Sequence, residues 1–199
     1  MLNWEGGRAM NITIRKARKE DAQAAIPLIM EAIGDISMHI TGETKEAEIT
    51  IEFKNLFTRT DNRHSYLYTY IAEMEGKVSG VLVFYSAEQV IELDANLEKY
   101  LSNKKGIPVK IDPETLPGEW YIDTVVVDPA YRGKGIGTEL LNYAEQLVKS
   151  FGGGKLSLNV ETKKGAAISL YNRLSFETLC PWTIIDEPFY HMVKTIPAN

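Results

Sequence analysis

Residues 121–151 read YIDTVVVDPAYRGKGIGTELLNYAEQLVKSF, and this stretch is the most informative part of the chain. It opens with a β-branched run, Ile122 to Val127, which Asp128-Pro129 brings to an end. After a glycine-rich turn, apolar residues recur at helical spacing on one face as far as Phe151. Gly152-Gly153-Gly154 then ends the pattern. The stretch therefore predicts a strand, a glycine-rich turn and an amphipathic helix.

The turn from Arg132 to Thr138 has the features of an anion-binding loop. Its alternating glycines let a ligand approach the backbone closely. The first N–H groups of the following helix have no partner within the helix, and the helix dipole adds partial positive charge there. Arg132 and Lys134 contribute fixed charge. We therefore expect the turn to bind a phosphate or pyrophosphate.

The glycine spacing distinguishes this loop from two common phosphate loops. The patterns G-x-G-x-x-G and G-x-x-x-x-G-K-[ST] both fail to match the sequence. The pattern R-x-x-G-x-G/A does match, with Arg132, Gly135 and Gly137 in its fixed positions. The segment from Tyr121 to Leu141 thereby closely resembles the central motif of the GCN5-related N-acetyltransferase (GNAT) superfamily.

A second segment extends this resemblance towards the C-terminus. Residues Ala167 to Phe176 fit the frame A-x-x-L-Y-x-x-x-x-F. Two positions depart from the family pattern, because Ser175 stands where glycine is usual and Lys164 stands where asparagine is common. The first departure alters a turn, and the second affects one side-chain contact to the cofactor arm.

The resemblance implies an α/β (α+β) fold with a mixed, mostly antiparallel central sheet, splayed central strands and flanking helices. We expect residues 10–199 to form a single GNAT-like domain with an insertion at about 87–119. Residues 1–9 show no periodicity and are interpreted as an N-terminal extension.

Hydrophobic patterns predict the remaining elements of this domain. Helices are expected along the stripe from Ala22 to Ile36, with a kink or shifted start at Pro27, and around residues 44–57 and 88–101. Strands are expected at residues 12–15, 66–72, 78–85, 155–161, 183–185 and 190–196. In the superfamily the first two helices cover the acceptor site.

The resemblance implies acetyl-CoA as co-substrate, and no metal. Backbone groups of the strand before the loop would bind the pantetheine arm, and the loop N–H groups would bind the pyrophosphate. The expected cofactor-binding residues are Val125, Val126, Val127, Arg132, Gly133, Lys134, Gly135, Ile136, Gly137 and Thr138.

The implied reaction is N-acetyl transfer to an amine by direct attack in a ternary complex. Tyr171 matches the tyrosine that serves as general acid in many GNAT enzymes. Three carboxylates near the central strand could act as general base, namely Glu119, Asp123 and Glu161, and Asp123 is favoured. The backbone N–H of Val126 could stabilise the oxyanion.

Composition limits the other classes of function. A chain of 199 residues with 44% hydrophobic residues suggests one domain, and its net charge of −5 argues against broad nucleic-acid or membrane surfaces. Neither a transmembrane-length apolar run nor a leader pattern occurs in the sequence, so we expect a cytoplasmic protein. Cys180 allows no internal disulfide and is expected to be buried, and the three histidines show no metal-ligand spacing.

The identity of the acceptor is open at this point. A small amine or polyamine, an amino acid, an antibiotic, and a protein N-terminus or lysine all fit, while the acidic insertion favours a small cationic amine. Edge strands or the C-terminal hairpin could pair two copies into a homodimer. Two other classes remain as alternatives: a non-catalytic acyl-CoA-binding sensor, and a phosphate-binding regulatory module.

Overall fold

The computed structural model describes residues 12–197, so the proposed extension at residues 1–9 lies outside it. A seven-stranded sheet in the order β1-β2-β3-β4-β5-β7-β6 forms its centre. Only β4 and β5 pair in parallel, which confirms the predicted mixed, mostly antiparallel sheet. The strands are β1 (Ile12–Lys16), β2 (Thr69–Met74), β3 (Lys77–Ser86), β4 (Trp120–Val127), β5 (Lys155–Glu161), β6 (Glu177–Ile184) and β7 (Glu187–Thr195).

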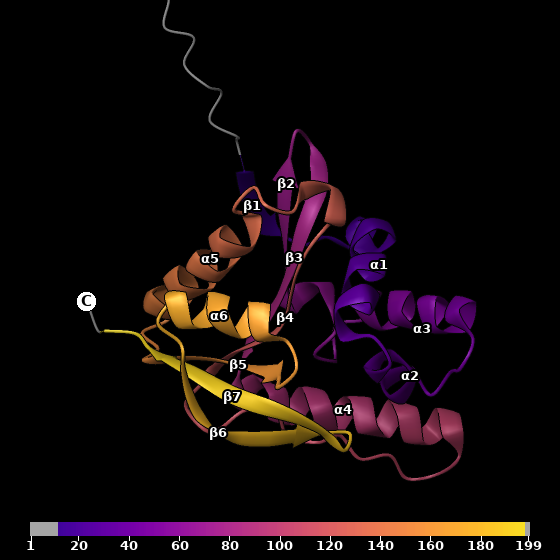
Figure 1. Ribbon diagram of the computed structural model, residues 1–199. Helices are drawn as coiled ribbons and strands as arrows, with labels where there is room; N and C mark the ends of the chain where they lie inside the picture. The colour runs from indigo at the N-terminus through magenta and orange to yellow at the C-terminus, as the bar shows by residue number, and fades with distance from the viewer. Residues whose placement is uncertain (1–11, 198–199) are drawn as a thin grey trace, which may run out of the picture.

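Helices cover both faces of this sheet (Figure 1). On one side lie α5 (Ile136–Ser150) and α6 (Gly165–Arg173), and on the other lie α1 (Ala22–Ile33), α2 (Ile36–Thr41) and α3 (Glu46–Thr58). Helix α4 (Ala87–Lys105) follows β3, and residues 106–119 lead from it into β4 without helix or strand. Single 3₁₀ turns occur at Lys19–Asp21, Tyr66–Tyr68 and Pro129–Tyr131.

Each face of the sheet has its own hydrophobic core. The predicted apolar stripe of α5 is confirmed, because Leu140, Ala144 and Val148 are fully buried against the sheet. Phe151, at the end of that stripe, is instead 54% exposed and stacks on Trp120 with 4.7 Å between ring centroids. The opposite core joins α1 and α3 to the other face of the sheet.

The predicted first helix is divided in two. Pro27 lies within α1 without ending it, and Gly34, with φ of +55°, follows the last residue of that helix. Ile36, expected on the stripe of the first helix, therefore begins the separate helix α2. The left-handed Gly42 ends α2, as the break after Thr41 indicated.

The central strands separate where the site forms. Parallel pairing of β4 with β5 covers three residue pairs and stops at Ile122 and Leu158. On its other side β4 carries a bulge, because Ile122 pairs with Phe84 and Thr124 with Val83, which leaves Asp123 as the extra residue. A bulge bends its strand and increases its twist. Beyond Ile122, β4 therefore diverges from β5, which confirms the predicted splay.

The C-terminal hairpin is longer than the sequence indicated. Residues 183–185 and 190–196 were expected as strands, but β6 begins at Glu177 and β7 at Glu187. Most of β6 is exposed at the edge of the sheet, so its sequence lacks the alternation that marks a half-buried strand. Cys180, expected to be buried, is only half-buried on this edge strand.

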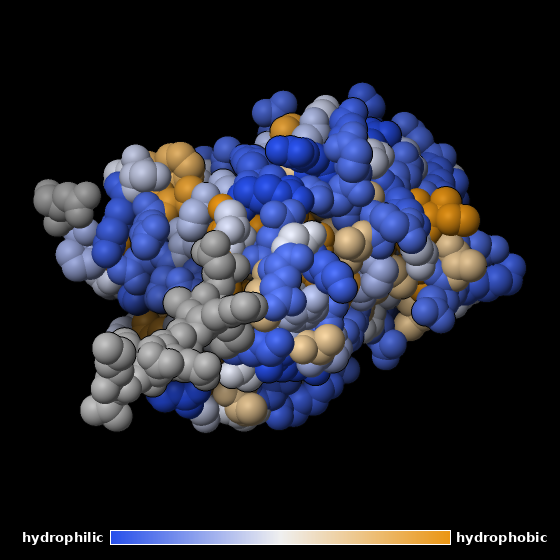
Figure 2. Space-filling model, turned by 90° about the horizontal axis from the view of Figure 1, so that it is seen from above, coloured by the Kyte–Doolittle hydropathy of each residue, from blue (hydrophilic) through white to orange (hydrophobic). Residues whose placement is uncertain are grey.

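The face of the molecule that is seen from above in Figure 2 is largely polar. Seen from above, hydrophilic side chains dominate, and apolar residues form small separate groups among them (Figure 2). Among residues 12–197, every helix is too short or too polar to cross a bilayer.

Candidate active site

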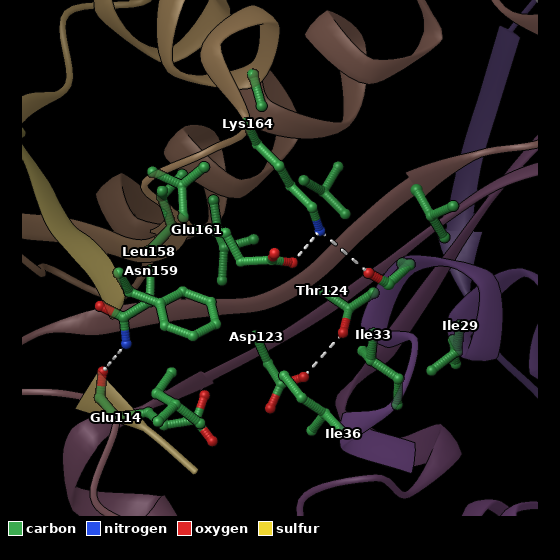
Figure 3. A pocket seen from close by; sticks show the side chains of 18 of the residues that line it. Ile29, Ile33, Ile36, Glu114, Asp123, Thr124, Leu158, Asn159, Glu161 and Lys164 are labelled. Carbon is green, nitrogen blue, oxygen red and sulfur yellow. Dashed lines mark hydrogen bonds and ion pairs between the residues drawn. The ribbon is translucent and has the colours of Figure 1, made fainter. Parts of the chain in front are cut away.

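A cavity of about 350 Å³ occupies the gap between the splayed strands. Residues 121–127 of β4 form one wall, residues 158–161 of β5 form another, and Ile29 and Ile33 of α1 close it from the opposite side (Figure 3). Tyr171 and Ala167 of α6 also line it. The cavity therefore brings together β4, α6 and the two candidate catalytic residues, Asp123 and Tyr171.

The glycine loop has positive φ angles at two of its glycines. Gly133 and Gly135 have φ of +75° and +81°, which residues with a side chain rarely adopt. A Cβ at either position would meet nothing within 4 Å, so open space lies in front of the loop. No side chain caps the N-terminus of α5. The loop thus leaves room and N–H donors for an anionic group.

Arg132 connects this loop to the cavity, whose wall it helps to form. Its Nη2 lies 2.6 Å from Glu31 Oε1 at the end of α1, and its Nε donates to the Val127 carbonyl at 3.2 Å. Both members of the ion pair are about half exposed, so the pair contributes little and can exchange for a phosphate.

Tyr171 lies half-buried on α6, where its ring packs edge-on against Phe176 at 5.9 Å. Burial raises the pKa of Tyr171 to about 12. The phenol therefore keeps its proton at neutral pH and can donate a hydrogen bond inside the cavity.

Asp123 enters the cavity from the bulge in β4. Its Oδ2 accepts from the Tyr85 hydroxyl at 2.7 Å and its Oδ1 accepts from Thr124 Oγ1 at 2.9 Å. Arg63 Nε lies 4.0 Å from Oδ2. The bulge thus places a carboxylate, held by two hydroxyl donors, where β4 parts from β5.

A buried arginine organises the acids behind Asp123. Arg63 Nη2 lies 2.5 Å from Glu114 Oε1, and Arg63 Nε lies 3.5 Å from Asp94 Oδ1. Burial disfavours the charged guanidinium, but Glu114, Tyr85, Asp94 and Asp123 outweigh it and hold the pKa of Arg63 well above its usual value. Among residues 12–197, no group accepts a hydrogen bond from Nη1.

Burial raises the pKa values of two of the acids around this arginine, Asp94 and Glu114. Burial raises the pKa of Asp94 to about 6, with Arg63 opposing and Glu114 adding to the shift. Burial also raises the pKa of Glu114, and Asp123 adds to that shift. The Tyr121 hydroxyl donates to Glu114 Oε2 at 2.9 Å. Glu114 is thereby a better proton acceptor near neutral pH than an ordinary carboxylate.

Glu119, one of the three carboxylates considered as base, occupies a different environment. It is 1% exposed and accepts from Leu116 N, Ser157 Oγ and Thr115 Oγ1, while His191 Nε2 lies 3.1 Å away. Burial would raise its pKa, but the hydrogen bonds from His191, Leu116 and Ser157 lower it overall. It is absent from the cavity lining, so we assign it a structural role.

Glu161, the third candidate, lines the cavity but is engaged by lysines. Lys164 Nζ lies 2.5 Å from Glu161 Oε1 and also donates to the Ala32 carbonyl of α1 at 3.5 Å (Figure 3). Lys163 contacts the other carboxylate oxygen at 2.9 Å. The Lys164 side chain thus crosses from the β5 side of the cavity to α1.

The structure adds three residues that the sequence did not indicate as part of the site: Arg63, His64 and Glu114. Arg63 and His64 belong to a polar run before β2 that resembles any connecting loop, and Glu114 lies in the predicted acidic insertion among other acids. No local sequence signal distinguishes them, because tertiary packing brings residues 63 and 114 together. Within residues 12–197, no group of three or more His, Cys, Asp or Glu side chains could hold a metal ion.

Comparison with known proteins identifies the class of protein that this chain resembles. A model of the Acetyltransferase (GNAT) family matches residues 30–176. A crystal structure of an acetyltransferase is 31% identical, covers 93% of this chain and 100% of its own, and superposes with a TM-score of 0.74. The N-acetyltransferase of Staphylococcus aureus Mu50 is 24% identical with the same TM-score, covering 91% of this chain and 99% of its own, and shows the fold alone.

The chain belongs to the GNAT acetyltransferase family, which implies acyl-CoA-dependent acetyl transfer. The N-alpha-acetyltransferase RimI of Mycobacterium tuberculosis is 41% identical over 63 residues, which are 32% of this chain and 38% of that protein. The matched stretches span 17% to 38% of the length of the first curated relatives.

Proposed function

We propose that this protein is an N-acetyltransferase that moves an acetyl group from acetyl-CoA to a primary amine by direct attack in a ternary complex. The cavity between the splayed strands carries the proposal, because Asp123 and Tyr171 line it together with Arg132 of the glycine loop. The N–H groups of residues 133–138 bind the pyrophosphate, and the backbone of residues 125–127 binds the pantetheine arm.

The reaction requires a free amine. A primary aliphatic amine has a pKa of about 10, so about one molecule in a thousand is unprotonated near pH 7, equivalent to about 4 kcal/mol of barrier. Asp123 removes the ammonium proton, with Glu114 as the neighbouring carboxylate of raised pKa. The nitrogen then attacks the thioester carbonyl, and a backbone N–H on the β5 side of β4 stabilises the oxyanion. The Val126 N–H expected in this role is turned towards β3, because Val126 pairs with Val81 there.

The attack has already formed the C–N bond. Collapse of the tetrahedral intermediate restores the carbonyl and breaks the C–S bond, and the nitrogen gives up its second proton, which the thiolate or water accepts. The leaving thiolate has a thiol pKa of about 8.5, well below that of Tyr171, so full proton transfer from the phenol is uphill in water. Tyr171 therefore stabilises the thiolate by donating a hydrogen bond. Its proton transfers fully only if the buried site raises the thiol pKa as well.

Thermal and denaturant unfolding with acetyl-CoA tests the cofactor site. At about 100 times its dissociation constant, a ligand that binds only the folded state adds roughly 2.7 kcal/mol. Gly135→Glu should abolish this stabilisation by placing a carboxylate in the loop. Gly152→Glu is the matched control, because Gly152 also has positive φ, of +71°, and open space, but lies at the other end of α5.

Release of thiol in the presence of an amine panel then separates an enzyme from an acyl-CoA sensor. The enzyme releases free coenzyme A in proportion to acetylated amine. A well-folded parent that is not stabilised by acetyl-CoA would contradict the proposed function, and stabilisation without transfer would favour the sensor.

A further inference from the structure

A second cavity, of about 400 Å³, adjoins the first. It lies among α2, α4, residues 107–114 and the turn between β6 and β7. Ile36, Ile40, Arg63, His64 and Glu114 line both cavities, so the two meet at these residues. A molecule whose amine reacts in the first cavity can therefore extend into the second.

The walls of the second cavity are mainly apolar. Leu97, Ile107, Val109, Ile111 and Ile184 are among the residues that form them. Ile107 is 61% exposed, although large apolar residues are usually covered. An apolar group bound there would remove this surface from water and gain affinity.

Charge is distributed unevenly between the two ends of this cavity. At the junction with the first cavity, Glu114, Asp123 and Asp94 surround the single cation Arg63. His64 adds no charge there, because burial lowers its pKa to about 4. At the other end Lys105 and Lys110 line the cavity along with Asp112, and Lys110 is paired with Glu98 at 2.8 Å. Acids outnumber cations at the junction, whereas the two kinds of charge balance at the far end, so a cation is favoured at the junction.

We propose that the acceptor is a small monoamine with an apolar body, whose ammonium group binds beside Glu114 and Asp123 and whose body fills the second cavity. This inference rests on the proposed function, since the same amine receives the acetyl group. Each oxygen of Asp123 already accepts one hydroxyl donor and has capacity for a second bond, which an ammonium N–H supplies.

Two other classes of amine fit this arrangement less well. A polyamine would place its second ammonium against the apolar walls, at a cost in desolvation and without the excess of acids that the junction offers. A free amino acid would place its carboxylate close to Glu114 and Asp123, next to the acids that attract its ammonium. An apolar monoamine avoids both costs.

The first experiment measures calorimetric binding of hexylamine, 2-phenylethylamine, spermidine and leucine to the full chain without acetyl-CoA. The same amines are then compared by kcat/KM in the thiol-release assay. The two apolar monoamines should bind, and their kcat/KM should exceed those of spermidine and leucine by about tenfold or more, equivalent to at least about 1.4 kcal/mol.

Ile107→Glu places a carboxylate on the apolar wall at an exposed position, where it does not disturb the core. It should lower the kcat/KM ratio of hexylamine to spermidine by about tenfold, because a second ammonium gains a partner while the alkyl chain loses an apolar wall. Ile91→Glu is the control, since Ile91 is 73% exposed on α4 and lines neither cavity.

The outcomes distinguish this inference from the proposed function. Binding or acetylation that favours spermidine or leucine over both monoamines would overturn the inference while leaving N-acetyl transfer intact. An unchanged ratio in Ile107→Glu would overturn the placement of the body in the second cavity. Failure of acetyl-CoA to stabilise the fold would count against the proposed function, and amine binding would still decide the inference.

Discussion

Among single residues, Asp123 and Glu114 are the two carboxylates that line the cavity beside Arg63, at its proposed reacting end. If Asp123 removes the ammonium proton, Asp123→Asn should lower kcat/KM by about 100-fold near pH 7, within the usual range for a general base. The loss should shrink as the pH rises towards 9, because more of the amine is then free and needs no base. Profiles of kcat/KM against pH measure this directly.

Glu114→Gln provides the comparison for that profile. This variant keeps the shape of the side chain and should weaken the binding of the amine, so that KM increases at every pH. Two results together would assign the role of base to Glu114. The kcat/KM of Glu114→Gln would recover to the parent's value at high pH, and the kcat/KM of Asp123→Asn would be lowered equally at every pH. Glu92→Gln is the control, because Glu92 is exposed on α4, and it should leave KM and kcat/KM unchanged.

Tyr171 offers a second residue-level test. Tyr171→Phe removes only the hydroxyl, and we expect kcat to fall by about 10- to 100-fold because the thiolate leaves without its hydrogen bond. The dissociation constant of acetyl-CoA should change little, since most of its proposed contacts are to the backbone. Tyr143→Phe, on α5 and packed edge-on against Tyr70, is the control. Equal loss in both variants would show that Tyr171 is only a packing residue.

At the level of elements, a buried network joins the end of the 106–119 segment to β5 and β7. Asn159 Nδ2 donates to the Glu114 carbonyl, and Asn159 Oδ1 lies 2.8 Å from His191 Nδ1. The other ring nitrogen of His191 lies 3.1 Å from Glu119 Oε2. His191 thus connects Asn159 of β5 to Glu119, which directly precedes β4.

Glu119→Gln should therefore lower the free energy of unfolding and leave kcat unchanged. The buried Glu119 carboxylate accepts hydrogen bonds from Leu116, Ser157 and Thr115, and leaving such buried donors without their acceptor costs about 1–3 kcal/mol. Because the folded-state pKa of Glu119 is lowered, its contribution is present above the unfolded pKa and is lost as pH falls through the folded pKa, so the variant should lose part of the parent's acid sensitivity. Urea unfolding at several pH values measures this, and a large loss of kcat in the folded variant would restore Glu119 as a candidate base.

Helices and strands whose apolar residues recur at a regular spacing were predictable from the sequence, and those without such a spacing were not. The pattern of β5 matched residues 155–161 because its two faces alternate, and α5 matched because its stripe is long. The edge strand β6 has few buried residues, so it left no pattern between Glu177 and Trp182. The division of α1 from α2 depends on the positive φ of Gly34, which a stripe of isoleucines conceals.

For the whole molecule, Asp94 couples global stability to pH. Its folded pKa of about 6 exceeds the unfolded value, so ionised Asp94 destabilises the fold above about pH 6, and the cost declines as pH falls towards 4. The shift of about two pKa units corresponds to about 3 kcal/mol. Asp94→Asn should accordingly be more stable than the parent by about 1–3 kcal/mol at about pH 8, and this advantage should vanish near pH 4.

Unfolding at those pH values tests the sign of the effect. The groups that face Asp94 are Arg63, Glu114, Asp123 and Glu98. If the pairing with Arg63 outweighs the burial of the carboxylate, Asp94→Asn will be less stable at pH 8, contrary to this prediction. Glu92→Gln on the same helix should show no pH-dependent difference.

The proposed cofactor half of the site follows from local sequence, whereas the proposed acceptor half depends on tertiary structure. Gly133 and Gly135 predict a loop of positive φ because few other residues adopt it, so the proposed pyrophosphate site can be recognised from the sequence. The junction of Arg63 with Glu114 and Asp123 joins three segments that are distant in sequence. Whether residues 87–119 are an insertion, and whether two copies associate, stay predictions.

The extra residue at Asp123 also reverses which residues of β4 face each side of the sheet. Before the bulge, even-numbered residues such as Trp120 and Ile122 face the α5 core, whereas after it the odd-numbered Val125 and Val127 do so. Substitutions at Asp123 preserve this reversal, but deletion of one residue would cancel it. Val125 and Val127 would then exchange faces with Val126, so the strand tolerates a different residue here far better than one residue fewer.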